Sequence, residues 1–122
     1  MAKVLIIEDN RANMTLATFL LQSAGHTVLS ATDAEAGLTL ARGEQPNLIL
    51  MDIQLPGMDG LEATALLKGD QATRDIPVIA LTALAMKGDE ERIRAAGCDG
   101  YIAKPVRYQE FLATVGAQLA RT

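Results

Sequence analysis

The sequence has little of what nucleic-acid binding or an oxidising environment would require. Its 122 residues include one cysteine, Cys98, no tryptophan and only 3% aromatic residues. A single cysteine cannot close an internal disulfide, so we expect a reducing, cytoplasmic location. The formal net charge is −4 without a basic run, and few aromatic rings are present on which bases would stack. We therefore expect no nucleic-acid partner.

Long hydrophobic runs are also missing. The longest nearly apolar stretch covers residues 78–86, and Thr82 interrupts it. Because a membrane span needs about 20 apolar residues, we expect no membrane segment. The apolar run Val4 to Ile7 has only four residues before the first acidic residue, which is too short for the apolar region of a signal peptide. With 49% hydrophobic and 21% charged residues, the chain has the composition and length of one globular domain.

What the sequence does contain is a regular alternation of short apolar runs and longer amphipathic stretches. Three of the five runs are continuous apolar tetrads, which are typical of strands buried on both faces of a parallel sheet. The amphipathic stretches have helical periodicity, and several follow capping residues such as Asn10, Asp33 and Asp59. Five strand–helix units predict a doubly wound (βα)5 fold of the α/β class, with a parallel five-stranded sheet and helices on both faces. The predicted strands cover residues 4–7, 27–31, 48–51, 78–81 and 101–103, and the predicted helices about 11–24, 34–42, 60–68, 86–96 and 107–120.

Polar residues follow the predicted strands at the points where the strands end. In open α/β sheets, ligands bind beyond the carboxyl ends of the strands, so these residues are expected to share one edge. The second strand is followed by Thr32-Asp33, which we interpret as a helix cap outside the site. The other four strand ends carry Glu8, Asp9, Asp52, Thr82 and Lys104.

These five residues have the chemistry of a metal-assisted phosphoryl site. Carboxylates 4 Å apart repel each other by about 4 kcal/mol at an effective dielectric of about 20, so such a group takes up protons or binds a cation. Hard oxygen ligands with open positions suit Mg²⁺, which commonly combines one or two carboxylates with phosphate oxygens. Thr82 and Lys104 are then placed to hold phosphoryl oxygens, and Asp52 is a candidate nucleophile.

Each of these residues has an ordinary explanation when it is taken alone. An aspartate after a strand usually caps a helix or forms a turn, a threonine there is a common strand-end hydroxyl, and a lone lysine is usually solvated. What favours a functional site is that all five residues lie at the same end of their strands.

Three other classes of protein lack their signatures here. A flavodoxin needs a phosphate-binding loop after the first strand, where this chain has Glu8-Asp9. A P-loop enzyme needs a glycine directly before a lysine, and no glycine in this chain has that position. A dehalogenase-like phosphatase needs Asp-x-Asp, but Gln54 stands where the second aspartate would be, and it cannot serve as a general acid.

Four blocks of the sequence resemble the receiver domain of two-component response regulators. They are the acidic pair Glu8-Asp9, the phosphoacceptor block 47–60, the switch block 77–83 and the lysine block 97–105. The resemblance extends from Lys3 to the final helix and implies a flavodoxin-like receiver fold with strand order 2-1-3-4-5. It also implies that residues 1–122 form one receiver domain, and we expect no output domain.

The resemblance assigns roles around the nucleophile. Asp52 would accept a phosphoryl group from a histidine kinase or a phosphotransfer protein. Asp9 and Asp52 would bind Mg²⁺ directly, Glu8 would bind it through water, and the backbone carbonyl of Gln54 would complete the set. Many receivers have aspartate where this chain has Glu8, which keeps the charge on a longer side chain.

The same resemblance assigns a switch. Thr82 and Lys104 would bind phosphoryl oxygens. Tyr101, three residues before Lys104, matches the switch aromatic of the family, so Thr82 and Tyr101 would change position together. The Lys104–Pro105 peptide bond would be cis, an isomer that a proline permits.

We therefore predict a single-domain response regulator that signals by phosphorylation-dependent protein contacts, and not an enzyme that turns over an external substrate. Residues 85–94 are similar to stand-alone receivers of the DivK type, which regulate the bacterial cell cycle and polarity. Receivers within hybrid kinases also use such a stretch. The downstream partner would bind residues about 86–96, Tyr101 and the last helix. The alternatives are a receiver of a hybrid histidine kinase, a phosphorelay intermediate or a phosphate sink.

Overall fold

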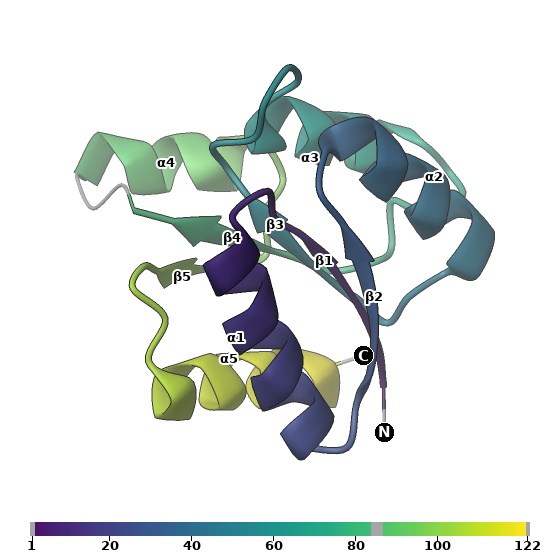
Figure 1. Cartoon of the computed structure of the whole chain (residues 1–122). Coiled ribbons are helices and arrows are strands. Elements are labelled where there is room, and N and C mark those ends of the chain that lie inside the picture. The colour runs from purple at the N-terminus through teal and green to yellow at the C-terminus, as the bar shows by residue number, and fades with distance from the viewer. Residues whose placement is uncertain (1, 84–86, 122) are drawn as a thin grey trace.

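The computed structural model describes residues 2–83 and 87–121. Within these residues strands and helices alternate along the chain, as the sequence predicts (Figure 1). The strands are β1 (Lys3–Ile7), β2 (Thr27–Ala31), β3 (Leu48–Asp52), β4 (Val78–Thr82) and β5 (Gly100–Ala103). The helices are α1 (Arg11–Ser23), α2 (Ala34–Glu44), α3 (Gly60–Gly69), α4 (Lys87–Ala95) and α5 (Tyr108–Ala120).

These strands form one parallel sheet in the order β2-β1-β3-β4-β5. The order and the flavodoxin-like architecture confirm the expectation drawn from the family resemblance. In the register of the sheet, Ile7 at the end of β1 lies opposite both Ala31 of β2 and Met51 of β3. The chain moves outward from β1 to β2 and then crosses back to β3, so the direction of winding reverses between β1 and β3. Ligands of open α/β sheets bind at such a reversal, beyond the carboxyl ends of the strands.

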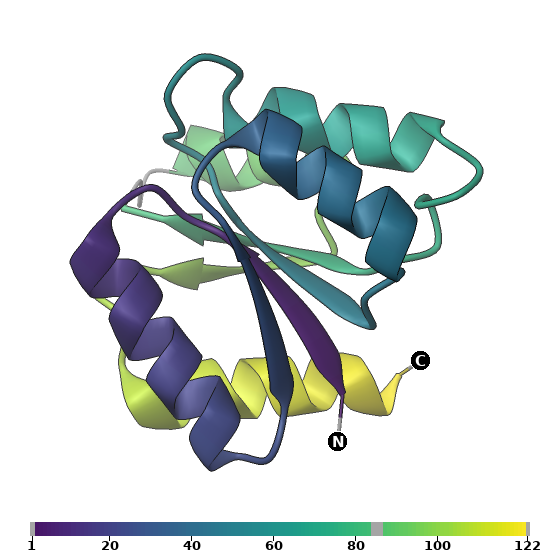
Figure 2. The same ribbon diagram turned by 45° about the vertical axis from the view of Figure 1, so that its right-hand side comes forward.

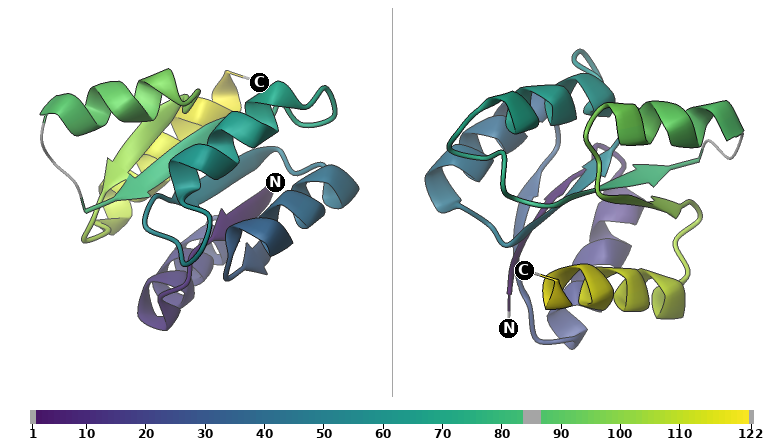
Figure 3. Two further views of the ribbon diagram at one scale, coloured as in Figure 1. Left: turned by 90° about the horizontal axis from the view of Figure 1, so that it is seen from above. Right: turned by 180° about the vertical axis from the view of Figure 1, so that it is seen from behind.

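Helices cover both faces of the sheet. Figures 1 and 2 show α1 and α5 on one face and α2, α3 and α4 on the other. Two further views show the same three layers from above and from behind (Figure 3). Because both faces are covered, the central strands have no side that can remain polar.

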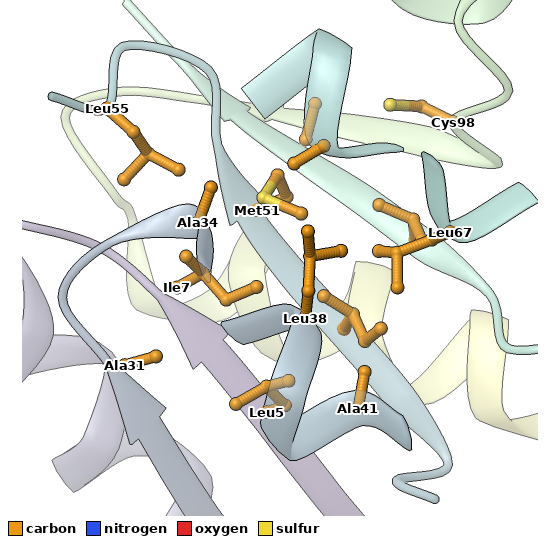
Figure 4. Close-up of a cluster of buried hydrophobic side chains, with 14 of the residues drawn as sticks. Leu5, Ile7, Ala31, Ala34, Leu38, Ala41, Met51, Leu55, Leu67 and Cys98 are labelled. Carbon is orange, nitrogen blue, oxygen red and sulfur yellow. The ribbon is translucent and has the colours of Figure 1, made fainter. Parts of the chain in front are cut away.

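The core confirms the prediction of strands buried on both faces. Every residue of β3 and β4 is buried. Alternate residues of β1 serve opposite layers, since Leu5 and Ile7 pack with α2, while Val4 and Ile6 pack with α1 and α5. Figure 4 shows the cluster of buried side chains that contains Leu5 and Ile7, in which Leu38 of α2 packs against the sheet.

Side-chain caps determine where three of the helices begin. The side chains of Asn10, Asp33 and Asp59 each accept a hydrogen bond from the backbone N–H three residues further on, at 2.8–2.9 Å. These bonds satisfy N–H groups that have no partner within the helix. The cap formed by Asp33 confirms that this residue serves α2.

The end of α2 differs from the sequence prediction. The helix was expected to end near residue 42, but it continues to Glu44. Gln45 then adopts a left-handed conformation with φ of 49°. Its side-chain amide donates to the carbonyls of Ala41, Arg42 and Ala72 at 3.4, 3.2 and 3.0 Å. A glutamine thus takes a position that glycine usually occupies, and the hydrophobic period does not reveal such a cap.

The remaining helix boundaries lie close to the predicted ones. The fourth helix was expected from residue 86, but Met86 lies outside the described residues and α4 is described from Lys87. Arg107 precedes the last helix as its N-cap. In the part of the chain that the structure describes, no helix is both long enough and apolar enough to cross a membrane.

Candidate functional site

The carboxylates predicted from the sequence gather at the carboxyl edge of the sheet. Glu8 and Asp9 follow β1, and Asp52 is the last residue of β3. Because Ile7 lies opposite Met51, the residues that follow them, Glu8 and Asp52, lie side by side. One oxygen from each of the three carboxylates lies within 4.8 Å of the other two. The predicted clustering of these acids is therefore confirmed.

Lys104 approaches this cluster from the far side of β4. Its backbone N–H donates to the carbonyl of Thr82 at 2.8 Å, which continues the pairing of β5 with β4. Its ammonium nitrogen lies 2.8 Å from Oε1 of Glu8 and 3.2 Å from Oδ1 of Asp52. The Lys104–Pro105 peptide bond is cis, as predicted. One lysine thus bridges two carboxylates that come from neighbouring strands.

The site has a buried floor and one exposed acid. Glu8, Asp52 and Thr82 are only 1–3% exposed. Asp9, in contrast, is exposed at the mouth of the cluster. Two ionisable carboxylates are therefore largely removed from water, while the third faces the side from which a ligand would arrive.

Backbone groups orient the two buried carboxylates. Oδ1 of Asp52 accepts a hydrogen bond from the backbone N–H of Gln54 at 3.1 Å. Oε2 of Glu8 accepts one from the backbone N–H of Asn10 at 3.3 Å. In both cases the donor belongs to the loop that leaves the residue's own strand, so each carboxylate is held by the turn that follows it. The role of the Gln54 carbonyl as a metal ligand stays a prediction.

The proximity of the acids separates their pKa values. Burial, together with the hydrogen bond and the negative charge of Glu8, raises the pKa of Asp52 to about 7. Burial also acts to raise the pKa of Glu8, but hydrogen bonds with Asp52 and Lys104 outweigh it and lower that pKa. Burial acts to lower the pKa of Lys104, yet the two carboxylates raise it, so the lysine stays charged. Without a cation, the arrangement favours a charged Glu8–Lys104 pair beside an Asp52 that readily takes up a proton.

The donor set fits a hard divalent cation. All three acidic groups offer carboxylate oxygens, which Mg²⁺ prefers, and one of them opens to solvent where water ligands can be kept. Three carboxylates against one lysine leave an excess of negative charge that a divalent cation would neutralise. The residues present are therefore compatible with magnesium.

Sequence reasoning missed one contact in this site. It placed Lys104 on the oxygens of a phosphoryl group and did not predict the ion pair with Glu8. The signal was present in the sequence, because glutamate is one methylene longer than the aspartate common in receivers. Only the packing of β1 against β3 shows that this length directs the carboxylate toward the lysine.

The predicted switch residue Tyr101 belongs to the edge strand of the sheet. It lies opposite Ala80 in the sheet, within β5, and is 38% exposed. The predicted partner surface of residues about 86–96, Tyr101 and the last helix corresponds to α4, β5 and α5, except that Met86 lies outside the described residues. Its function stays a prediction.

The sequence of this chain is similar to known regulators. Residues 4–116 match the response regulator receiver domain family. The chain is 50% identical over 116 residues to the polar-differentiation response regulator DivK of Brucella ovis, with 95% of this chain and 94% of that protein covered. The DivK proteins of two Brucella abortus strains are also 50% identical to this chain over 116 residues.

Solved structures share the fold over nearly the full length. A putative response regulator from Chloroflexus aurantiacus has a TM-score of 0.94 at 28% identity, with 98% of both chains covered. The receiver domain of a sensor histidine kinase from Pseudomonas aeruginosa has a TM-score of 0.90 at 34% identity, again with 98% of both chains covered. That second structure is described with a magnesium ion coordinated in its active-site cleft.

Proposed function

The chain belongs to the response regulator receiver domain family, and on this premise we propose that it accepts a phosphoryl group on Asp52. The donor would be the phosphohistidine of a histidine kinase or of a phosphotransfer protein. The observation that carries the proposal is the convergence of Lys104 with three carboxylates at one edge of the sheet. Phosphoryl transfer requires mainly a positioned nucleophile and neutralisation of charge, and this edge offers both.

In the proposed transfer, a carboxylate oxygen of Asp52 attacks the phosphorus atom. A phosphorus–oxygen bond forms while the phosphorus–nitrogen bond to the donor imidazole breaks, and the electron pair of that bond stays with the nitrogen. The product on Asp52 is an acyl phosphate. Lys104 would exchange its contact with Glu8 for a phosphoryl oxygen, and the Thr82 hydroxyl would donate to another.

Magnesium would assist this step. Asp9, Asp52 and the backbone carbonyl of Gln54 would hold the ion directly, and Glu8 would hold it through water. When bound, it supplies positive charge that neutralises the carboxylates and the phosphoryl oxygens together. The exposed position of Asp9 and the magnesium described in the Pseudomonas receiver support this assignment.

The signal would leave through protein contacts and not through turnover of an external substrate. Phosphate on Asp52 would draw Thr82 inward, and Tyr101 would move into the space that Thr82 leaves. This change would remodel the surface formed by α4, Tyr101 and α5, on which a downstream protein would bind. Phosphate can shift such an equilibrium only if it binds one of the two states better.

The likeness to DivK supports a cytoplasmic regulator that acts in cell polarity and the cell cycle. Identity of 50% over 95% of the chain is the observation behind this finer assignment. A second candidate is a receiver that belongs to a hybrid kinase, which the 34% identity with the Pseudomonas kinase receiver favours. The length of the native protein, measured on a blot of the source cells, separates the two.

The test is phosphotransfer from purified, autophosphorylated histidine kinases in the presence of Mg²⁺. At least one kinase is expected to label the wild type and to leave Asp52→Asn unlabelled, because the amide lacks the nucleophilic charge. Asp33→Asn is the matched control, since asparagine also caps helices and the labelling should persist. Stoichiometric labelling of Asp52→Asn would refute the assignment of the nucleophile.

A further inference from the structure

Gly60, the first residue of α3, lies directly against the backbone of the proposed nucleophile. A Cβ atom placed on Gly60 would be 2.1 Å from the backbone oxygen of Asp52 and 2.8 Å from the Cα of Ile53. Cβ atoms essentially never approach other atoms within 3.0 Å, so a side chain at this position requires the backbone to move. The helix therefore meets the end of β3 at a distance that only glycine permits.

Space, and not backbone conformation, demands a glycine here. In the described residues the glycines with positive φ are Gly25, Gly57 and Gly97, and Gly60 is not one of them. Its φ is therefore one that alanine can adopt. The clash with Asp52 is the reason that remains.

The backbone next to Asp52 is held from both sides. The backbone N–H of Gly60 donates to the carbonyl of Ile53 at 2.9 Å, and the N–H of Ile53 donates to the carbonyl of Leu81 in β4 at 3.1 Å. On the helix side, Ala63 and Leu67 are 0–1% exposed, so α3 cannot retreat without opening the core. The segment that follows Asp52 is thus clamped between α3 and β4.

We propose that Gly60 is a positioning residue for the phosphoacceptor site. By lacking a side chain, it lets α3 press on the Asp52–Ile53 peptide and so sets the position of the Asp52 carboxylate relative to the Gln54 carbonyl. This inference rests on the proposed function, in which both groups bind Mg²⁺. Functional groups need to be held within about 0.5 Å of their productive positions. An added Cβ at Gly60 would have to move from 2.1 Å to more than 3.0 Å from the Asp52 backbone oxygen, and this displacement exceeds that tolerance.

The test compares Gly60→Ala with Val115→Ala. Val115 is fully buried in α5, on the opposite face of the sheet, so its truncation lowers stability without touching the site. Gly60→Ala is expected to weaken Mg²⁺ binding about fivefold or more and to slow labelling by acetyl phosphate about tenfold or more. Val115→Ala should keep both quantities within about twofold of wild type. Urea unfolding of both variants shows that each is folded under the conditions of the assay.

If Gly60→Ala does not fold alone, the substitution is repeated in a chain that also carries Gly43→Ala and Gly116→Ala. An added Cβ at either position meets nothing within 4 Å, so both changes should stabilise their helices. A chain that stays unfolded even then would overturn the proposal, because Gly60 would serve folding alone. Equal Mg²⁺ affinity and labelling rate in folded Gly60→Ala and Val115→Ala would also overturn it. A wild type that neither binds Mg²⁺ nor becomes labelled would instead refute the proposed function.

Discussion

The ammonium nitrogen of Lys104 lies closer to Glu8, at 2.8 Å, than to Asp52, at 3.2 Å. The Glu8 side chain is 1% exposed and the Lys104 side chain 17%, so water screens this pair only weakly. A buried carboxylate without a counter-ion is costly, and Lys104 is the cation that lets Glu8 and Asp52 lie side by side. In the resting site the lysine is shared between two acids, and in the proposed transfer it must change partner.

Removing this cation should destabilise the protein. Lys104→Met is expected to lower the free energy of unfolding by about 2–4 kcal/mol at pH 7 without metal, because it leaves the Glu8 carboxylate buried and unpaired. Urea denaturation measures the loss. The control is Lys3→Met, which removes an ion pair with Glu44 whose side chains are 38% and 49% exposed and should cost less than about 1 kcal/mol. A loss in Lys104→Met no larger than in the control would contradict the buried pair.

The raised pKa of Asp52 predicts that stability falls as the pH rises. Because burial and Glu8 raise this pKa to about 7, the folded protein holds a proton that the unfolded chain releases near pH 4. This stabilising contribution is complete below about pH 4 and is lost as the pH rises through about 7. The lowered pKa of Glu8 acts in the opposite sense, but its contribution is lost only as the pH falls below about 4.5.

Relative to Asp52→Asn, the wild type in a metal chelator should therefore lose about 1–3 kcal/mol of unfolding free energy between about pH 5 and 8. Saturating Mg²⁺ should cancel the loss, since it binds the ionised carboxylate. Its affinity should accordingly rise over the same range. Parallel pH profiles of the wild type and Asp52→Asn would show that Asp52 does not titrate there.

Asp9 should be needed for the metal but not for the fold. It is exposed, so Asp9→Asn should change the unfolding free energy by less than about 0.5 kcal/mol. The loss of a charged ligand should weaken Mg²⁺ binding about tenfold or more and slow phosphorylation at low Mg²⁺. Calorimetric titration compares this variant with Asp33→Asn, which keeps its cap and should bind Mg²⁺ like the wild type. Unchanged affinity in Asp9→Asn would mean that the ion is held elsewhere.

Thr82 should couple phosphorylation to partner binding. Thr82→Ala is expected to accept phosphate on Asp52 but to lose most of the gain in partner affinity that phosphorylation brings, because alanine lacks the hydroxyl that would donate to the phosphoryl oxygen. The measurement is the affinity of a captured partner with and without beryllofluoride, which mimics the phosphoryl group. Thr82→Ser keeps the hydroxyl and should keep the gain.

The matched control for this switch is Thr73→Ala. Thr73 lies in the segment that joins α3 to β4 and is 1% exposed. Its hydroxyl donates to the carbonyl of Leu67 in α3 at 2.7 Å. Its loss removes a buried hydroxyl without touching the end of β4 where Thr82 lies. An equal gain from beryllofluoride in the wild type and Thr82→Ala would remove Thr82 from the switch.

Much of the fold follows from local patterns in the sequence. Continuous apolar tetrads such as Val4–Ile7 predict strands buried on both faces, and β1 confirms it. Asn10, Asp33 and Asp59 predict where helices begin, because a capping side chain needs only the N–H groups a few residues ahead of it. The order of the strands came from the family resemblance, since parallel pairing joins residues far apart in the chain.

The residue types of the candidate site were likewise determined by the sequence, because the carboxyl ends of parallel strands meet at one edge. What only the tertiary structure decided is how those residues are paired. The register of β1 against β3 places Glu8 within reach of Lys104, and the docking of α3 brings Gly60 against the backbone of Asp52. Glu8 and Lys104 come from opposite ends of the chain, and the contact of Gly60 with Asp52 depends on how closely the whole of α3 packs against the sheet. No local pattern in the sequence encodes either distance.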